Sequence, residues 1–207
     1  MLEIFLFINP IGKLCYQTEQ GIMQLISHSN QHIRSRFITV LSLKTIDDVL
    51  KVRKQQLSDL NLRNQLADEI YRSALDFKAA SFQGKKRGCK FLFEIQKQVG
   101  IQNRPYNEEV VNSAAKSAGL DWEMFSSDRQ SKLAIKSFHN DQKVAAEMNV
   151  TSHPTIVVYD EKNGGDALSF SGQDALPALN RYLSKKDDQT PPSCSLFSRF
   201  DPHPFNS

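Results

Sequence analysis

Residues 9–16 read Asn9-Pro10-Ile11-Gly12-Lys13-Leu14-Cys15-Tyr16 and directly follow the first apolar run of the chain. Dithiol redox chemistry needs an attacking thiol of low pKa at the start of a helix and a resolving thiol within one helical turn. Cys15 occupies the resolving position of such a pair, whereas Gly12 occupies the position of the attacking cysteine. A chain that keeps this frame without its nucleophile is expected to bind a partner rather than to transfer electrons.

The segments around this turn predict the opening of a parallel βαβ unit. Residues 2–8 are rich in Ile, Leu and Phe without a helical period, which is typical of a central strand, and Pro10 ends this run. From Cys15 to about Ser29, apolar residues recur at helical spacing, and residues 36–42 read as a second strand. Strand, helix and strand in this order predict a right-handed parallel crossover.

A long helical block follows the second strand. Between about Thr45 and Met148 the apolar residues recur three and four positions apart, and no convincing strand is present. Gly100 follows an apolar helical run, and Asn103-Arg104-Pro105 is expected to break the chain. The segment Ser126-Ser127-Asp128 is predicted to cap a last long helix that runs toward Met148.

The sheet is predicted to resume after this block. A β-branched run at residues 155–159, a glycine-rich turn at residues 163–166 and a second run at residues 167–170 indicate a β-hairpin. A final helix is expected from Asp174 to about Ser184, because leucines recur on one of its faces.

These boundaries predict an α/β fold in which a helical insertion interrupts the sheet domain. Residues 1–44 and 149–184 are expected to form the discontinuous sheet domain, and residues 45–148 the all-helical insertion. Residues 185–207 are rich in Pro and Ser, cannot bury enough apolar surface to order themselves, and are expected to form a disordered tail.

Composition excludes several classes of partner. The net charge of +3 comes from 26 basic and 23 acidic residues that are mixed along the chain, so neither a nucleic-acid-binding arm nor a polybasic membrane patch is expected. No signal peptide or transmembrane helix is recognisable, and the predicted location is the cytoplasm. The five histidines and three cysteines lack metal-ligand spacing, so neither a metal site nor a disulfide framework is expected.

The segment Thr151-Ser152-His153-Pro154-Thr155 precedes the predicted third strand. Because proline cannot donate to a central ladder, Pro154 is expected to stand at the first position of that strand. A cis His153-Pro154 bond would place residues 152 and 153 beside the start of the first helix. The sequence leaves the cis and trans forms open.

Together these features resemble the thioredoxin-like proteins of the DsbA type, in which a helical domain interrupts the thioredoxin fold. The resemblance covers residues 2–184 and implies an α/β thioredoxin-like fold. Within that group the chain looks like the cytosolic adaptors that present the transcription regulator Spx to the ClpXP protease. The residues that prompt this likeness are Phe7-Ile8-Asn9-Pro10, the stretch from Ala79 to Gly88, and the stretch from Ala114 to Phe125.

The resemblance implies a non-catalytic adaptor with Spx as its direct partner, ClpXP as its indirect partner, and no cofactor. By analogy with where thioredoxin-like folds bind peptides, the expected contact residues are Asn9, Pro10, Gly12, Lys13, His153 and Pro154. The alternative is an enzyme that uses Cys15 alone, either a thiol-disulfide oxidoreductase or a glutathione-linked enzyme. That alternative needs an exposed thiolate, whereas the second cysteine of such a pair is usually turned inward.

Overall fold

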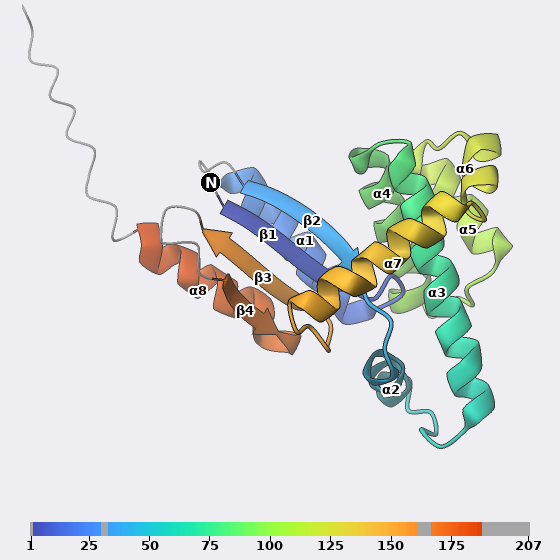
Figure 1. The fold of residues 1–207 in the computed structure, drawn as a ribbon, viewed down its shortest axis with the longest axis horizontal. Coiled ribbons are helices and arrows are strands. Elements are labelled where there is room, and N and C mark those ends of the chain that lie inside the picture. The colour runs from blue at the N-terminus through green and yellow to red at the C-terminus, as the bar shows by residue number, and fades with distance from the viewer. Residues whose placement is uncertain (1, 30–32, 161–166, 188–207) are drawn as a thin grey trace, which may run out of the picture.

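The computed structural model describes residues 2–29, 33–160 and 167–187 and contains a four-stranded mixed sheet with the order β2-β1-β3-β4 (Figure 1). β1 pairs with β2 in parallel and with β3 antiparallel, and β3 pairs with β4 antiparallel. The strand bounds are β1 Leu2–Ile8, β2 Ile33–Thr39, β3 Thr155–Asp160 and β4 Ala167–Ser171. The predicted strands are therefore present, whereas the turn predicted at 163–166 lies outside the described residues.

The second strand begins and ends about three residues earlier than the sequence suggests. β1 ends at Ile8 because Pro10 follows, so the chain beyond Thr39 has no neighbouring strand to pair with except at one position, where Val40 N–H donates to the Ile8 carbonyl at 2.9 Å. Ser42 then caps the next helix by accepting a hydrogen bond from Thr45 N–H. β2 therefore ends where its parallel pairing with β1 ends, although the apolar residues Val40 and Leu41 follow.

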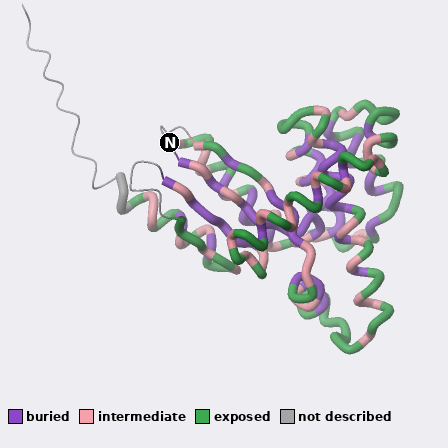
Figure 2. Tube along the Cα trace, viewed as in Figure 1, coloured by how far each residue is buried: buried purple, intermediate pink, exposed green. Residues whose placement is uncertain are grey.

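Helices cover both faces of the sheet. α1 (Lys13–His28) and α8 (Ala175–Asp187) pack on one face, where their apolar side chains meet alternate residues of β1 and β3. The C-terminal end of α7 (Lys132–Glu147) packs on the other face against Phe7 and Val157. Figure 2 shows the buried residues concentrated along the strands and the inward sides of the helices.

The chain between β2 and β3 is all helical in the structure. Its elements are α2 Leu43–Val52, α3 Leu60–Phe82, α4 Lys85–Ile95, the π-helical segment η1 Gln96–Ile101, α5 Glu108–Ala118, α6 Trp122–Asp128 and α7 Lys132–Glu147. A short 3₁₀ turn, η3 Gly172–Asp174, leads into α8. The helical character of this block agrees with the three-and-four apolar spacing.

Two details of the block differ from expectation. Ser126, Ser127 and Asp128 end α6 instead of capping α7; Ser131 caps α7 by accepting a hydrogen bond from Ala134 N–H at 3.1 Å. Gly100 does not follow a helix, because α4 continues through it as the π-helical segment. Both the segment 126–128 and Ser131 offer side chains that can cap a helix. Ser131 is used, because it stands three residues before the buried Ala134.

A buried ion pair fixes the helical block to the sheet. Lys78 on α3 lies 2.5 Å from the carboxylate of Asp141 on α7, and both side chains are largely buried. The same Asp141 oxygen accepts hydrogen bonds from the backbone N–H and the hydroxyl of Thr39 at the end of β2, both at 2.7 Å. Asp141 therefore joins α3, α7 and β2 at one point.

A second buried carboxylate, Asp76 on α3, organises the far side of the block. It accepts hydrogen bonds from the Tyr106 hydroxyl and from Arg129 Nε, the latter at 2.7 Å. Arg129 also bonds Glu108 in the first turn of α5.

Among the described residues, no helix is both long and apolar enough to cross a membrane. The predicted tail lies almost wholly outside the described residues, and α8 continues to Asp187 rather than ending near Ser184.

Candidate functional site

The turn after β1 is held together by Asn9. The buried Asn9 carbonyl accepts a hydrogen bond from Gly12 N–H at 3.0 Å, and the Asn9 side-chain oxygen accepts one from Ile11 N–H at 3.0 Å. The Asn9 N–H points to Cys15 Sγ at 3.2 Å. One side chain and its peptide groups thus set both the path of the turn and the position of the thiol.

Cys15 lies in the first turn of α1 and is completely buried. Burial raises the pKa of its thiol far above the ordinary value, and the nearby Glu19 raises it further. Its Sγ lies 3.5 Å from His153 Nδ1. The helix N-terminus, which favours a thiolate at exposed positions, is outweighed here by the loss of solvation. This geometry favours a packed, protonated thiol over a reactive one.

Gly12 stands at the N-cap of α1 and makes no side-chain cap hydrogen bond. A Cβ added there would lie 3.3 Å from Cys15 Sγ and 3.2 Å from the Asn9 carbonyl oxygen. The first distance is close to the spacing that a disulfide requires between Cβ and the opposite sulfur. A cysteine at position 12 would therefore bring its Cβ close enough to Cys15 Sγ for a disulfide.

The loop before β3 lies against this turn. The His153-Pro154 bond is cis, which resolves the alternative that the sequence left open. Pro154 is buried, and its carbonyl accepts a hydrogen bond from Gly172 N–H at 2.8 Å. Burial lowers the pKa of His153, and its Nε2 is buried without a hydrogen-bond partner among the described residues. His153 is therefore predominantly neutral beside Cys15 at neutral pH.

A buried carboxyl below the thiol was missed in the sequence. Glu19, one helical turn after Cys15, is fully buried, and burial raises its pKa to about 8. Gln96 in the π-helical segment donates to Glu19 Oε1 at 2.7 Å and to the Asn9 carbonyl at 3.3 Å. The available signal was the position of Glu19 on the same helix face as Cys15 and Ile22, both of which are buried.

Gly100 contributes to the site through its lack of a side chain. A Cβ on Gly100 would lie 3.0 Å from the Ile11 carbonyl oxygen and 3.1 Å from Lys13 N, closer than such atoms normally approach. The π-helical segment therefore rests directly on the turn backbone. From the sequence Gly100 is a helix terminator, whereas in the structure it lets two backbones meet.

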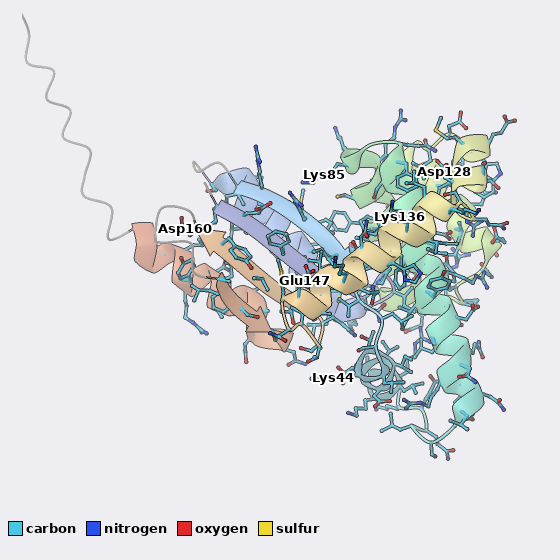
Figure 3. The ribbon with its side chains drawn as sticks, in the orientation of Figure 1. Lys44, Lys85, Asp128, Lys136, Glu147 and Asp160 are labelled. Atoms are coloured by element: carbon cyan, nitrogen blue, oxygen red, sulfur yellow. The ribbon has the colours of Figure 1, made fainter. Side chains whose placement is uncertain are left out.

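A groove of about 820 Å³ opens over the turn. Its walls come from the start of α1, from α2, from the π-helical segment, from the loop before Pro154 and from the residues that follow β4. Four basic side chains and one acidic side chain line it: Lys13, Lys44, Lys51, Arg53 and Asp48. Figure 3 shows Lys44 on α2, on the opposite side of the molecule from Lys85.

The groove keeps an excess of positive charge after its ion pairs are counted. Lys51 lies 3.9 Å from Asp48, and Arg53 lies 3.7 Å from Glu69. No carboxylate of the described residues pairs with Lys13 or Lys44. The first turn of α1 carries no acidic residue, so the positive end of the helix dipole adds to this charge. The groove is suited to an acidic ligand.

Apolar side chains complete the groove. Val52 is 72% exposed and Ile101 is 36% exposed, and both line it. Exposed apolar side chains with polar groups around them are typical of protein-interaction sites and ligand-binding grooves.

The residues expected to contact a partner fall into two groups. Gly12, Lys13 and His153 line the groove, together with Cys15. Asn9, Pro10 and Pro154 are buried and shape the turn and the loop from behind. In the described part of the chain, no group of three or more His, Cys, Asp or Glu residues is placed to hold a metal ion.

Comparison with known proteins identifies related sequences and folds. The chain matches the family described as thioredoxin over residues 5–181. It is 28% identical over 216 residues to the ClpXP adapter protein SpxH of Bacillus subtilis, spanning 92% of this chain and 71% of that protein. The ClpXP adapter protein SpxH of Staphylococcus saprophyticus is 30% identical over 171 residues, which is 83% of this chain and only 60% of that relative's length.

A solved structure confirms the fold class. The oxidoreductase DsbA of Xylella fastidiosa superposes with a TM-score of 0.59 at 14% identity, covering 90% of this chain and 86% of that one. At this identity the likeness shows the fold alone. The expectation of a thioredoxin-like, DsbA-type fold with helices inserted into the sheet is therefore confirmed.

Proposed function

The chain belongs to the thioredoxin family, and from that premise we propose that it is a non-catalytic adaptor that binds the transcription regulator Spx and promotes Spx degradation by ClpXP in the cytoplasm. The adaptor role follows from relatives named as ClpXP adapter proteins. Spx as the client follows from the resemblance of the insertion and of the Gly12 turn to that adaptor family.

The observation that carries this proposal is the buried thiol behind Gly12. Thiol-disulfide exchange begins with attack by an exposed thiolate, and the thiolate fraction falls tenfold for each unit by which the pKa rises. Cys15 is fully buried, and its pKa is raised far above neutrality. In this proposal the chain uses the surface around the Gly12 turn for binding, because Cys15 is too deeply buried to act as a nucleophile.

The cationic groove provides the binding surface in this proposal. Lys13 and Lys44 stand on two of its walls without carboxylate partners in the described structure, and Val52 and Ile101 supply apolar contact. We assign to it a client segment that carries acidic and aliphatic side chains. An adaptor needs only modest affinity, because tethering raises the effective concentration of the client at the protease.

Charge reversal tests this surface. The double variant Lys13→Glu, Lys44→Glu is expected to weaken Spx binding by about tenfold or more and to slow Spx turnover by ClpXP, because close opposite charges become like charges. Calorimetric affinity at two salt concentrations and a reconstituted degradation assay measure both effects. The control double variant Lys132→Glu, Lys136→Glu changes the net charge equally at two exposed positions of α7 and is expected to leave binding unchanged. Figure 3 labels Lys136 on this helix. If both double variants bind Spx with equal affinity, the groove does not contact Spx.

Restoring the missing cysteine tests the loss of redox chemistry. In Gly12→Cys the introduced thiol is expected to form a disulfide with Cys15, because a Cβ at Gly12 lies 3.3 Å from Cys15 Sγ. The chain has three cysteines, so the variant has four thiols, and oxidation should remove two of them in a thiol titration. Insulin reduction should rise above that of the natural protein and of Gly12→Ser. Unchanged thiol counts in oxidised glutathione would show that the turn is not a redox frame.

One contact favours a second candidate function. The 3.5 Å approach of Cys15 Sγ to His153 Nδ1 is the geometry of a thiol-imidazole pair, which could serve a monothiol or glutathione-linked enzyme. The adaptor proposal expects Spx turnover to survive Cys15→Ala. Insulin reduction or glutathione conjugation that is strong in the natural protein and lost in Cys15→Ala would instead establish the enzyme.

A further inference from the structure

The edge strand β4 is unusually open. It forms one side of the sheet, and of its five residues only Phe170 is partly buried (Figure 1). Leu168 remains 38% exposed although it lies next to the core of β3. An edge strand of this kind presents unpaired peptide groups to any chain that approaches it.

The hydrogen-bond register identifies which peptide groups of β4 have no hydrogen-bond partner among the described residues. Gly172 N–H bonds the Pro154 carbonyl, and these residues stand directly opposite in the register that pairs Thr155 with Ser171. In an antiparallel pair, hydrogen-bonded and non-hydrogen-bonded positions alternate. Leu168 and Phe170 therefore bond β3. The peptide groups of Ala167, Ser169 and Ser171 point away from the sheet.

The opposite edge of the sheet is protected. β2 carries the exposed charges of Arg34 and Arg36, and Lys85 from α4 donates to the Ser35 carbonyl at 2.5 Å. Charged side chains and blocked carbonyls prevent a further strand from pairing. β4 has the sequence Ala-Leu-Ser-Phe-Ser, with no charge and no proline. The two edges of one sheet thus differ in the features that normally prevent strand addition.

The free edge continues into the cationic groove. Ser171, the last residue of β4, lines the groove together with Gly172 and Gln173. A chain that lies along β4 therefore reaches the groove, which Lys13 and Lys44 also line. Because β4 itself is neutral, the part of such a chain beside it has no charge to neutralise, whereas the part in the groove meets cations.

We propose that β4 binds an extended segment of the client protein as a fifth strand, uncharged where it pairs with β4 and acidic where it enters the groove. This inference rests on the proposed adaptor function. Main-chain hydrogen bonds to Ala167, Ser169 and Ser171 supply affinity, and contact with Leu168 adds apolar burial. A second copy of this chain is the less suitable occupant, because two five-residue strands alone bury far less than a stable interface requires.

Amide hydrogen exchange measured by NMR tests this pairing residue by residue. In the free protein, the amides of Ala167, Ser169 and Ser171 are expected to exchange fast and those of Leu168 and Phe170 slowly. Saturating Spx should slow exchange of the Ala167, Ser169 and Ser171 amides by about tenfold or more. Fast and slow amides should then no longer alternate along β4. If Spx binds and the three amides stay fast, β4 pairing is wrong while the adaptor function stands; if Spx does not bind, both are overturned. Protection that grows with protein concentration without Spx would identify self-pairing instead.

A variant with a matched control tests the contribution to affinity. Ser169→Pro removes one outward N–H and keeps the hydrogen bonds to β3, so the strand should still fold, because edge strands tolerate proline. It is expected to weaken Spx binding by about tenfold, whereas Ser169→Ala, which keeps the N–H, should bind like the natural protein. Unchanged binding by a folded Ser169→Pro would overturn the proposal. Should that variant not fold, the exchange pattern of the natural protein still decides.

Discussion

Replacing Asp141 with alanine is expected to lower the free energy of unfolding by about 3–5 kcal/mol, a large part of the stability of an ordinary domain. The change leaves the Lys78 ammonium buried without its partner, which lies 2.5 Å away in the intact protein. It also removes the acceptor for the backbone N–H and the hydroxyl of Thr39. Because Asp141 joins α3, α7 and β2, the loss affects the contact between the helical block and the sheet.

Urea unfolding followed by circular dichroism measures this effect. Glu147→Ala, on the same helix, is the control; its partner Lys143 lies 3.8 Å away on an exposed surface, so a change below about 0.5 kcal/mol is expected. Adding Lys78→Met to Asp141→Ala should recover part of the loss, because the unpaired buried charge is then removed. A loss in Asp141→Ala no greater than in Glu147→Ala would contradict the assigned role of the ion pair.

Most of the fold was accessible from the sequence because its elements have strong periodic signals. The apolar run at residues 2–8 and the β-branched run at residues 155–159 match β1 and β3 closely, and the helical block contains no strand in the structure. The errors lie at boundaries that depend on neighbours. β2 stops where β1 runs out, and the start of α7 is decided by which capping residue precedes a buried position. The apolar periodicity of a segment does not show where its neighbouring strand ends or which of two capping residues is used.

The site was only partly accessible. Gly12, Cys15 and Pro154 stood out because their spacing matches a known chemical frame, and the structure brings Gly12, Cys15 and His153 to one groove. Glu19 and Gln96 look like ordinary polar residues of amphipathic helices. Their roles arise from burial by segments more than seventy positions away. A buried carboxyl can be recognised only when the packing of both elements is known.

Glu19 should give the protein a distinctive dependence of stability on pH. Its folded pKa is about 8, whereas the unfolded value is near 4.5, so the native state holds an extra proton between these values. Stability from this group is therefore fully present below about pH 4.5 and is lost progressively as the pH rises from there to about 8. The loss between pH 5 and 8 amounts to about 3 kcal/mol. His153 acts in the opposite direction, because its lowered pKa removes stability as pH falls.

The variant Glu19→Gln isolates the contribution of Glu19 ionisation to the free energy of unfolding. Glutamine is neutral at all these pH values and keeps an oxygen that can accept the hydrogen bond from Gln96 Nε2, so the buried contact is retained while the titration disappears. Relative to the natural protein, Glu19→Gln should gain about 3 kcal/mol in free energy of unfolding between pH 5 and pH 8, measured in urea at each pH. His153 contributes equally to both proteins and cancels in this difference. Glu123→Gln, an exposed position on α6, should show no such gain. A constant difference across the range would mean that Glu19 is charged in the folded state, and Cys15 would then lie beside a buried negative charge that suppresses its thiolate still further.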